Sequence, residues 1–241
     1  MKEAAKQRWK RGIFWFVLVS MALSVVYAVV MVCVAPDDAV NTEYRQKSDY
    51  VLMLLQCAAG VIVIFLPTIL ERKLKMEIPG FMQVMFFIFL YGAIYLGEVH
   101  SFYYRFANWD TILHTFSGGM LGALGFLVVS LLNRSEKVRI NLSPLFVSLF
   151  AFCFAIMVGV LWEIYEFTFD GLLGLNMQKF RLESGEMLVG REALADTMED
   201  LIVDAVGAFV VSLIGFCSMK GKQIWIARIQ LKRRSKMPEE A

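Results

Sequence analysis

Long apolar blocks separated by short polar stretches dominate the chain. Six of these blocks are about 20 residues long and nearly free of charged residues, the length at which an α-helix crosses the hydrocarbon core of a bilayer. They lie at residues 13–34, 50–70, 81–99, 110–132, 145–167 and 198–219. The pattern predicts an all-α fold, an integral membrane bundle of six transmembrane helices that forms a single membrane domain over residues 1–241.

Composition supports a membrane protein. Hydrophobic residues make up 58% of the chain and the mean hydropathy is +0.60, whereas soluble domains are about half apolar. The four cysteines all lie in apolar runs and form no CxxC pair, so neither a disulfide framework nor a zinc–thiolate site is expected. We expect membrane lipid as a partner and no nucleic acid.

The distribution of basic residues predicts the orientation. The two termini and the loops after the second and fourth blocks hold 18 of the 24 Lys and Arg residues, and the other three loops hold 6. The positive-inside rule therefore predicts that both termini lie in the cytoplasm. We interpret residues 220–241 as a basic cytoplasmic tail, with an amphipathic helix on the membrane surface as one arrangement.

The last apolar block begins with an acidic stripe. Asp196, Asp200 and Asp204 are four residues apart, so a helix places all three on one face. Asp204 lies about one turn inside the apolar run, where a lone carboxylate costs about 2.5–3.5 kcal/mol on insertion scales. Such a residue is expected to have a partner and a function.

Other polar residues fall at the same predicted depth, near the outer surface. Asp110 and His114 share one helix face at the start of the fourth block. The fifth block ends in WEIYEFTFD, which places further acids on one stripe, and the third ends near Glu98 and His100. The inner halves of these blocks are almost free of ionisable residues. The pattern therefore indicates one outward-facing acidic site with a histidine.

So many carboxylates cannot all remain bare anions in a poorly hydrated space. Some are protonated, or some point to water or lipid headgroups, or a divalent cation neutralises them. Carboxylates with one imidazole suit Mn²⁺, Mg²⁺, Zn²⁺ or Fe²⁺. The candidate metal ligands are Asp110, His114, Glu163, Glu166, Asp196, Asp200 and Asp204. Glu163 and His114 are also candidate catalytic residues, and Arg191 is a candidate counter-ion or anion clamp.

Each candidate also has a purely structural explanation. Asp110 could be a helix N-cap and Asp196 an ordinary charge at a helix N-terminus. His114 could bond a carboxylate only to hold two helices together. Glu163 could reach out to interfacial water, and Arg191 could be a loop residue. The glycines of the fourth block are interpreted as close helix packing, at Gly118, Gly119, Gly122 and Gly125.

Three ordered motifs resemble those of a known family. WDTILHTFSGG, then WEIYEF, then R-x4-D-x3-D-x3-D-x2-G resemble the YjdF-type bacterial membrane proteins and, more distantly, the VanZ-like family linked to glycopeptide (teicoplanin) resistance. The resemblance covers roughly residues 80–215 and implies a multi-pass protein of the bacterial cytoplasmic (inner) membrane. It implies site roles for Asp110, His114, Glu163, Glu166, Asp196, Asp200, Asp204 and Gly207, with Arg191 matching the arginine before the Asp-rich motif. VanZ-like proteins tend to carry asparagine at the position of Asp204, which is a departure here.

Three functions remain open from the sequence. The first is a metal-assisted enzyme, or resistance factor, acting from outside on a lipid or lipid-linked envelope substrate, with Glu163 as general base. The second is a proton- or cation-coupled transporter, since intramembrane carboxylates commonly relay protons or bind cations. The third is a structural or accessory protein whose polar cluster locks four helices together. No internal inverted repeat supports transport.

Overall fold

The fold was analysed in a computed structural model, which describes residues 2–35, 45–74, 76–133, 142–182, 184–221 and 232–233. Its elements are α1 (Lys2–Val34), α2 (Lys47–Val63), α3 (Leu66–Leu74), β1 (Met76–Glu77), α4 (Gly80–Leu90), η1 (Tyr91–Val99), α5 (Phe102–Arg105), α6 (Trp109–Asn133), α7 (Pro144–Leu173), α8 (Arg191–Lys220) and β2 (Lys232–Arg233). Six helical segments in this part of the chain are long and apolar enough to cross a membrane. The predicted six-helix membrane fold is therefore confirmed.

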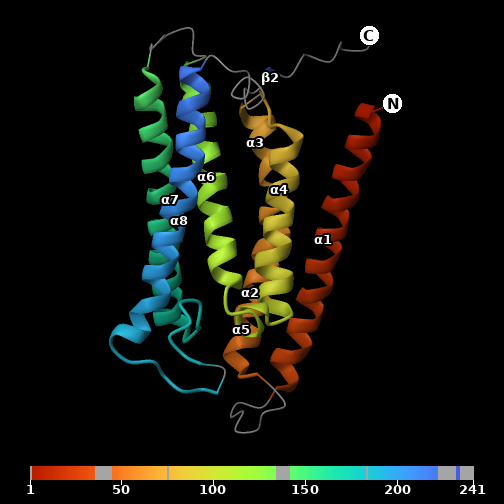
Figure 1. The fold of residues 1–241 in the computed structure, drawn as a ribbon. Helices are drawn as coiled ribbons and strands as arrows, with labels where there is room; N and C mark the ends of the chain where they lie inside the picture. The colour runs from red at the N-terminus through yellow and green to blue at the C-terminus, as the bar shows by residue number, and fades with distance from the viewer. Residues whose placement is uncertain are drawn as a thin grey trace.

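The six membrane-length segments form two groups of three. The helices α6, α7 and α8 pack together, and α1 packs against α2, α4 and η1. In Figure 1 these groups stand side by side, and they meet where α6 lies against α4 and η1. The helix α1 begins and α8 ends at the same end of the bundle, the upper end in Figure 1. The loop between α7 and α8 lies at the opposite end.

Two of the six segments depart from a regular α-helix. The second is divided at Ile64–Phe65 into α2 and α3. Pro67, the second residue of α3, has no N–H and so cannot continue the hydrogen-bond ladder across the break. The third continues from α4 into the π-helix η1, a wide helical form that is rare over more than one turn and is frequently found at functional sites. Apolar pattern alone predicts neither change.

The helices also extend beyond the apolar blocks. The helix α7 begins at Pro144, where Ser143 caps it by accepting a hydrogen bond from the Phe146 N–H at 3.2 Å. It continues to Leu173 and ends at Gly174, whose φ of 65° is in the left-handed region that favours glycine. The helix α8 begins at Arg191, seven residues before the predicted block. These extensions place all the acids of both motifs on regular helix.

The predicted glycine packing is confirmed between α6 and its neighbours. A Cβ on Gly118 would collide with the backbone of Asp204, and one on Gly122 would touch Ala208. Gly207 of α8 lies in the same way against the Thr115 carbonyl. Because the two backbones touch, side chains at the start of α6 and on the adjacent part of α8 are held at fixed separations. This contact is what positions the polar residues described below.

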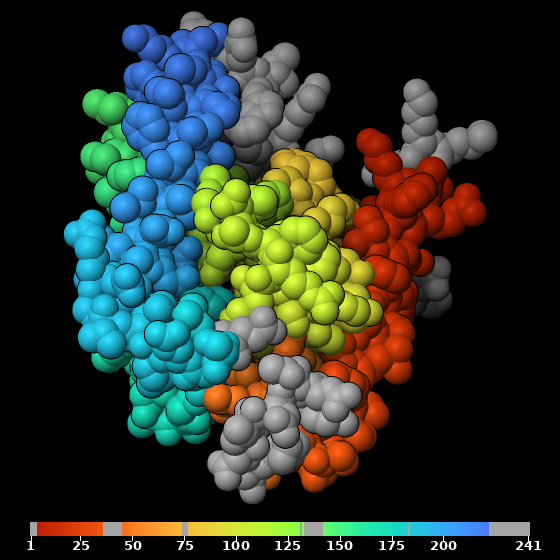
Figure 2. Space-filling view, turned by 60° about the horizontal axis from the view of Figure 1, so that its bottom comes forward, coloured from red at the N-terminus to blue at the C-terminus, as the bar shows by residue number. Residues whose placement is uncertain are grey.

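A short two-stranded sheet lies at one end of the bundle and the loop between α7 and α8 lies at the other. At the end where α1 begins, β1 pairs antiparallel with β2, Met76 opposite Arg233. Most of the predicted tail helix lies outside the described residues, and within them Lys232–Arg233 forms this strand instead, because the backbone bonds to β1. The division into one membrane domain and a separate tail stays a prediction. Figure 2 looks onto the other end, where the cyan loop at 174–190 lies across the ends of α7 and α8.

Candidate metal centre

Three helices bring the predicted site residues to one end of the second group. Asp110 and His114 lie on the first two turns of α6, and Asp200 and Asp204 lie on α8. The helix α7 contributes Glu163, Glu166 and Asp170, all of which are buried. The close contact of the glycines on α6 and α8 places Asp204 directly beside the first turns of α6. The sequence prediction that these helices share one polar layer therefore agrees with the geometry.

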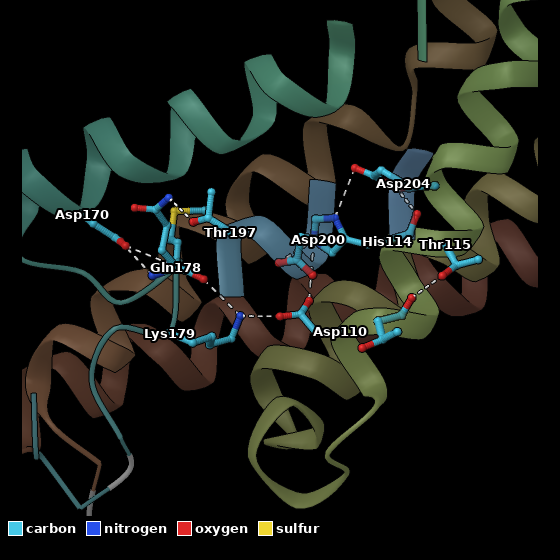
Figure 3. A network of polar contacts seen from close by, with 12 residues as sticks. Asp110, His114, Thr115, Asp170, Gln178, Lys179, Thr197, Asp200 and Asp204 are labelled. Atoms are coloured by element: carbon cyan, nitrogen blue, oxygen red, sulfur yellow. Dashed lines mark hydrogen bonds and ion pairs between the residues drawn. The ribbon is translucent and has the colours of Figure 1, made fainter. Parts of the chain in front are cut away.

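The densest part of the layer surrounds the His114 imidazole. Its Nε2 lies 3.7 Å from Asp110 Oδ1 and 3.6 Å from Asp200 Oδ2. One ligand atom from each of these three residues falls within 4.8 Å of the others. In Figure 3 Asp110 lies between Lys179 and the pair formed by His114 and Asp200. Two carboxylates and one imidazole in this arrangement form a donor set that a divalent cation can use.

The other ring nitrogen of the imidazole, Nδ1, contacts Asp204. Its Oδ2 lies 3.4 Å from His114 Nδ1, and its Oδ1 accepts a hydrogen bond of 2.9 Å from Ser117 Oγ. Gly159 of α7 makes room for this carboxylate, because a Cβ there would come within 2.8 Å of Asp204 Oδ2. A carboxylate that bonds the second nitrogen of a histidine fixes the orientation of the ring. Asp204 therefore orients His114 toward Asp110 and Asp200.

Two further acids leave carboxylate oxygens without partners. Glu163 is 5% exposed, and neither of its oxygens makes a hydrogen bond of normal geometry among the described residues, although the Gln178 and Thr197 side chains lie close to the carboxylate. Asp196 Oδ2 is buried and likewise unpaired. Glu163 is close enough to His114 and Asp204 to interact with both electrostatically. Buried polar atoms are nearly always paired in folded proteins, so an unpaired carboxylate beside a metal-capable group indicates that something positive or protic belongs there.

A lysine that the sequence analysis did not select lies within the cluster. The ammonium Nζ of Lys179, in the loop between α7 and α8, donates hydrogen bonds to Asp110 Oδ2 at 2.9 Å and to the Met177 carbonyl at 3.0 Å. It also lies 4.4 Å from the centre of the Tyr103 ring, within cation–π range. Burial disfavours its charge, but Asp110, Asp196 and Glu166 outweigh burial and hold the pKa of Lys179 well above its usual value.

The loop that carries Lys179 is fixed by its own polar contacts. Both oxygens of Asp170 accept backbone N–H groups, from Met177 at 2.8 Å and from Gln178 at 2.9 Å. The Gln178 side chain donates to Thr197 Oγ1 on α8 at 2.8 Å. Two residues after Lys179, Arg181 pairs with Asp49 of α2 at 3.0 Å. The loop therefore joins α7, α8 and the other helix group beside the site.

Some residues that the sequence placed near the site lie apart from it. Arg191 is exposed at the first residue of α8 and has no ion pair or hydrogen bond among those found in the described chain. His100 packs its ring against Tyr95, and Glu98 pairs with Arg45 at 3.9 Å, although it remains in electrostatic range of Lys179 and Asp110. The cation nearest the candidate ligands is thus Lys179, and the role of Arg191 stays a prediction.

The signal that would have identified Lys179 is weak in sequence. It lies in a glycine-containing loop without periodicity, so no helix face relates it to the acids. Its φ of 50° is a second indication of a special position, because residues other than glycine rarely adopt the left-handed region. That value is visible only in the structure. The sequence predicts which residues share a helix face four residues apart. It does not predict the contacts of the loop between α7 and α8.

Comparison with known proteins shows the family. A protein of Thermotoga maritima, described only as an uncharacterized protein, is 28% identical over 165 residues, which cover 68% of this chain and 77% of the relative. No solved structure matches. The family model described as predicted membrane protein (DUF2238) matches residues 17–221, which include every candidate ligand named above. The chain therefore belongs to the DUF2238 family of predicted membrane proteins.

Proposed function

We propose that this protein is a metal-dependent membrane enzyme of the bacterial cytoplasmic membrane, acting on a lipid or lipid-linked envelope substrate. The observation that carries the proposal is a partly buried donor set, Asp110, His114 and Asp200, beside the buried carboxylate of Glu163, which makes no hydrogen bond of normal geometry. Both termini lie in the cytoplasm in this proposal, so the site faces the outer leaflet. The likeness to YjdF-type proteins is consistent with the family, and the likeness to VanZ-like proteins stays a hypothesis.

The residues present fit a divalent cation. Asp110, His114 and Asp200 would hold it, and Asp204 orients the imidazole through its other nitrogen. Carboxylates and an imidazole suit Mn²⁺, Mg²⁺, Zn²⁺ and Fe²⁺, and the set contains no thiolate. When bound, such an ion supplies Lewis-acid activation of water and of a polarised substrate oxygen. The unpaired donors nearby, Glu163 and Asp196, are available for the substrate or for proton transfer.

Glu163 is suited to accept a proton. Its two oxygens make no hydrogen bond of normal geometry, with Gln178 and Thr197 as neighbours, its side chain is removed from bulk solvent, and it interacts electrostatically with His114. A general base must present a free oxygen to the water that it deprotonates, and a carboxylate already held by hydrogen bonds could not. Asp170, whose oxygens are both occupied by backbone N–H groups, illustrates the contrast. Lys179 keeps the charge of the cluster partly balanced without occupying Glu163.

The geometry does not favour transport. On α8, no acidic or basic residue stands between Asp204 and Lys220, and on α7 none stands between Pro144 and Trp162. A carrier that moves protons or cations needs polar groups along its route, and here they gather at one end. The buried serines deeper in the bundle, Ser148 and Ser212, carry no charge. An enzyme that works at one membrane face needs no such route.

Metal analysis tests the proposal. Detergent-purified protein is loaded separately with each of the four ions and desalted. Inductively coupled plasma mass spectrometry should then show one bound equivalent of at least one ion. Asp200→Asn and His114→Ala each remove a ligand and should abolish this binding. Asp49→Asn is the matched control, because Asp49 lies at the same end of the bundle but pairs with Arg181. Retention of none of the four ions by the wild-type protein would refute the proposal.

A further inference from the structure

The position of the Lys179 ammonium resembles that of a bound cation. Its two hydrogen-bond acceptors are oxygens, Asp110 Oδ2 and the Met177 carbonyl, at 2.9 and 3.0 Å. The carboxylates of Asp196 and Glu166 lie close enough to interact with it electrostatically. Carboxylate and carbonyl oxygens are the ligands that hard divalent cations prefer. The surroundings of Lys179 are therefore those of an oxygen-lined cation site.

The chain works against conformational preference to place this ammonium. Lys179 has a φ of 50°, which costs a residue with a side chain free energy that its surroundings must supply. The backbone just before it is fixed by Asp170, through the N–H groups of Met177 and Gln178. A lysine that only covered a surface would need neither feature. The loop is built to deliver one positive charge to one point.

Asp110 connects this point to the candidate metal ligands. Its Oδ2 accepts from Lys179, while its Oδ1 faces His114 Nε2 at 3.7 Å. One carboxylate that bridges two positive centres through different oxygens is the arrangement of two-metal sites. Six acids line the layer: Asp110, Glu163, Glu166, Asp196, Asp200 and Asp204. A single divalent ion neutralises two of these charges, and the Lys179 ammonium supplies a further positive charge beside Asp110.

We propose that the site has two adjoining cation positions that share Asp110, and that the Lys179 ammonium occupies the second in place of a divalent ion. The inference rests on the first position, which is the metal site of the proposed function. It assigns Lys179 as a tethered monovalent cation that limits the site to one metal ion. Asp110 Oδ2 and the Met177 carbonyl are the oxygens that a metal ion would meet there, with the carboxylates of Asp196 and Glu166 in electrostatic range.

Removal of the lysine side chain tests this assignment. Lys179→Ala empties the second position, and Mn²⁺ titration monitored by electron paramagnetic resonance and by elemental analysis should then show two bound equivalents where the wild type shows one. Lys179→Arg keeps the charge and should remain at one. If Lys179→Ala folds poorly, purification in Mn²⁺ should restore its thermal stability, because the ion replaces the lost charge.

The outcomes separate the two proposals. One equivalent in the wild type and one in Lys179→Ala, with equal affinity, overturns the inference and leaves the proposed function standing. Binding of none of the four ions by the wild type refutes the proposed function and, with it, the inference that rests on the first position. Failure of Mn²⁺ to restore Lys179→Ala, when Lys179→Arg folds normally, also overturns the inference, because the position would then require an ammonium or guanidinium group rather than charge alone.

Discussion

At the scale of single residues, neutral substitutions of two buried carboxylates on α7 are expected to change the free energy of unfolding in opposite directions. Glu163 is buried with both oxygens unpaired, whereas Asp170 accepts two backbone N–H groups. Replacement of an unpaired buried charge by a neutral side chain of the same shape removes a desolvation cost. Glu163→Gln in metal-free protein is therefore expected to raise the free energy of unfolding by on the order of 1 kcal/mol. The midpoint of thermal unfolding in detergent should rise as well.

Asp170→Asn should act in the other direction. An amide has one acceptor oxygen, so one of the N–H groups of Met177 and Gln178 would face an amide nitrogen. The expected loss is about 1–3 kcal/mol, the cost of leaving a buried donor unpaired. The two variants are compared in the same detergent by thermal unfolding. If Glu163→Gln lowers stability as much as Asp170→Asn does, Glu163 is a structural partner rather than a free base.

Sequence patterns located these residues to different degrees. Helix geometry alone places Asp110 and His114 on one face, because they are four residues apart, and it does the same for Asp200 and Asp204. The contact between His114 and both acids of α8 required the side-by-side placement of α6 and α8, which glycines signal only in general terms. Lys179 could not be predicted, because its position depends on a loop that returns to the bundle.

At the scale of elements, close contact between α6 and α8 determines the spacing of the site. Gly118 and Gly207 allow this contact, since a Cβ on either would collide with the backbone of the other helix. Gly118→Ala and Gly207→Ala are expected to lower the free energy of unfolding by about 1–3 kcal/mol through overpacking. Both should also weaken metal binding, because α8 must move away from His114. Thermal unfolding and Mn²⁺ affinity measure the two effects.

Gly171 of α7 is the matched control for these variants. A Cβ there meets nothing within 4 Å, and the residue is exposed on a helix. Gly171→Ala should be neutral or should stabilise the protein by about 0.5–1 kcal/mol, because alanine is the better helix former. Destabilisation by Gly171→Ala equal to that of Gly118→Ala would show that helix flexibility, rather than the contact between α6 and α8, explains the result.

The elements themselves were largely readable from hydropathy, and their irregularities were not. Blocks of apolar residues predicted six membrane-length helices, all of which are present in the described chain. The break before Pro67 and the wide turns of η1 depend on local backbone bonding that hydropathy does not report. The predicted apolar blocks 145–167 and 198–219 do not include the polar ends of α7 and α8, which the structure shows to be helical. Their helical continuation is what places Asp170 and Asp196 within the layer.

At the scale of the whole molecule, the site lies at one end of the bundle, and α1 begins and α8 ends at the other (Figure 1). An even number of membrane crossings requires that α1 begins and α8 ends on the same side, and Figure 1 shows this arrangement. The basic residues concentrate on that side, with 18 of 24 in the termini and the adjoining loops. The positive-inside rule therefore predicts that the loop at 174–190 and the polar layer face outward.

Cysteine labelling of intact bacteria tests this orientation. The starting protein is a variant in which the four native cysteines are replaced by alanine. Val189 is 80% exposed on the loop, and Gly221 is exposed just after α8, so Val189→Cys and Gly221→Cys report on opposite ends. A membrane-impermeant maleimide added outside the cells should modify the first, and should modify the second only after the membrane is permeabilised. The reverse pattern would place the acidic layer at the cytoplasmic face, where an outer-leaflet substrate could not reach it.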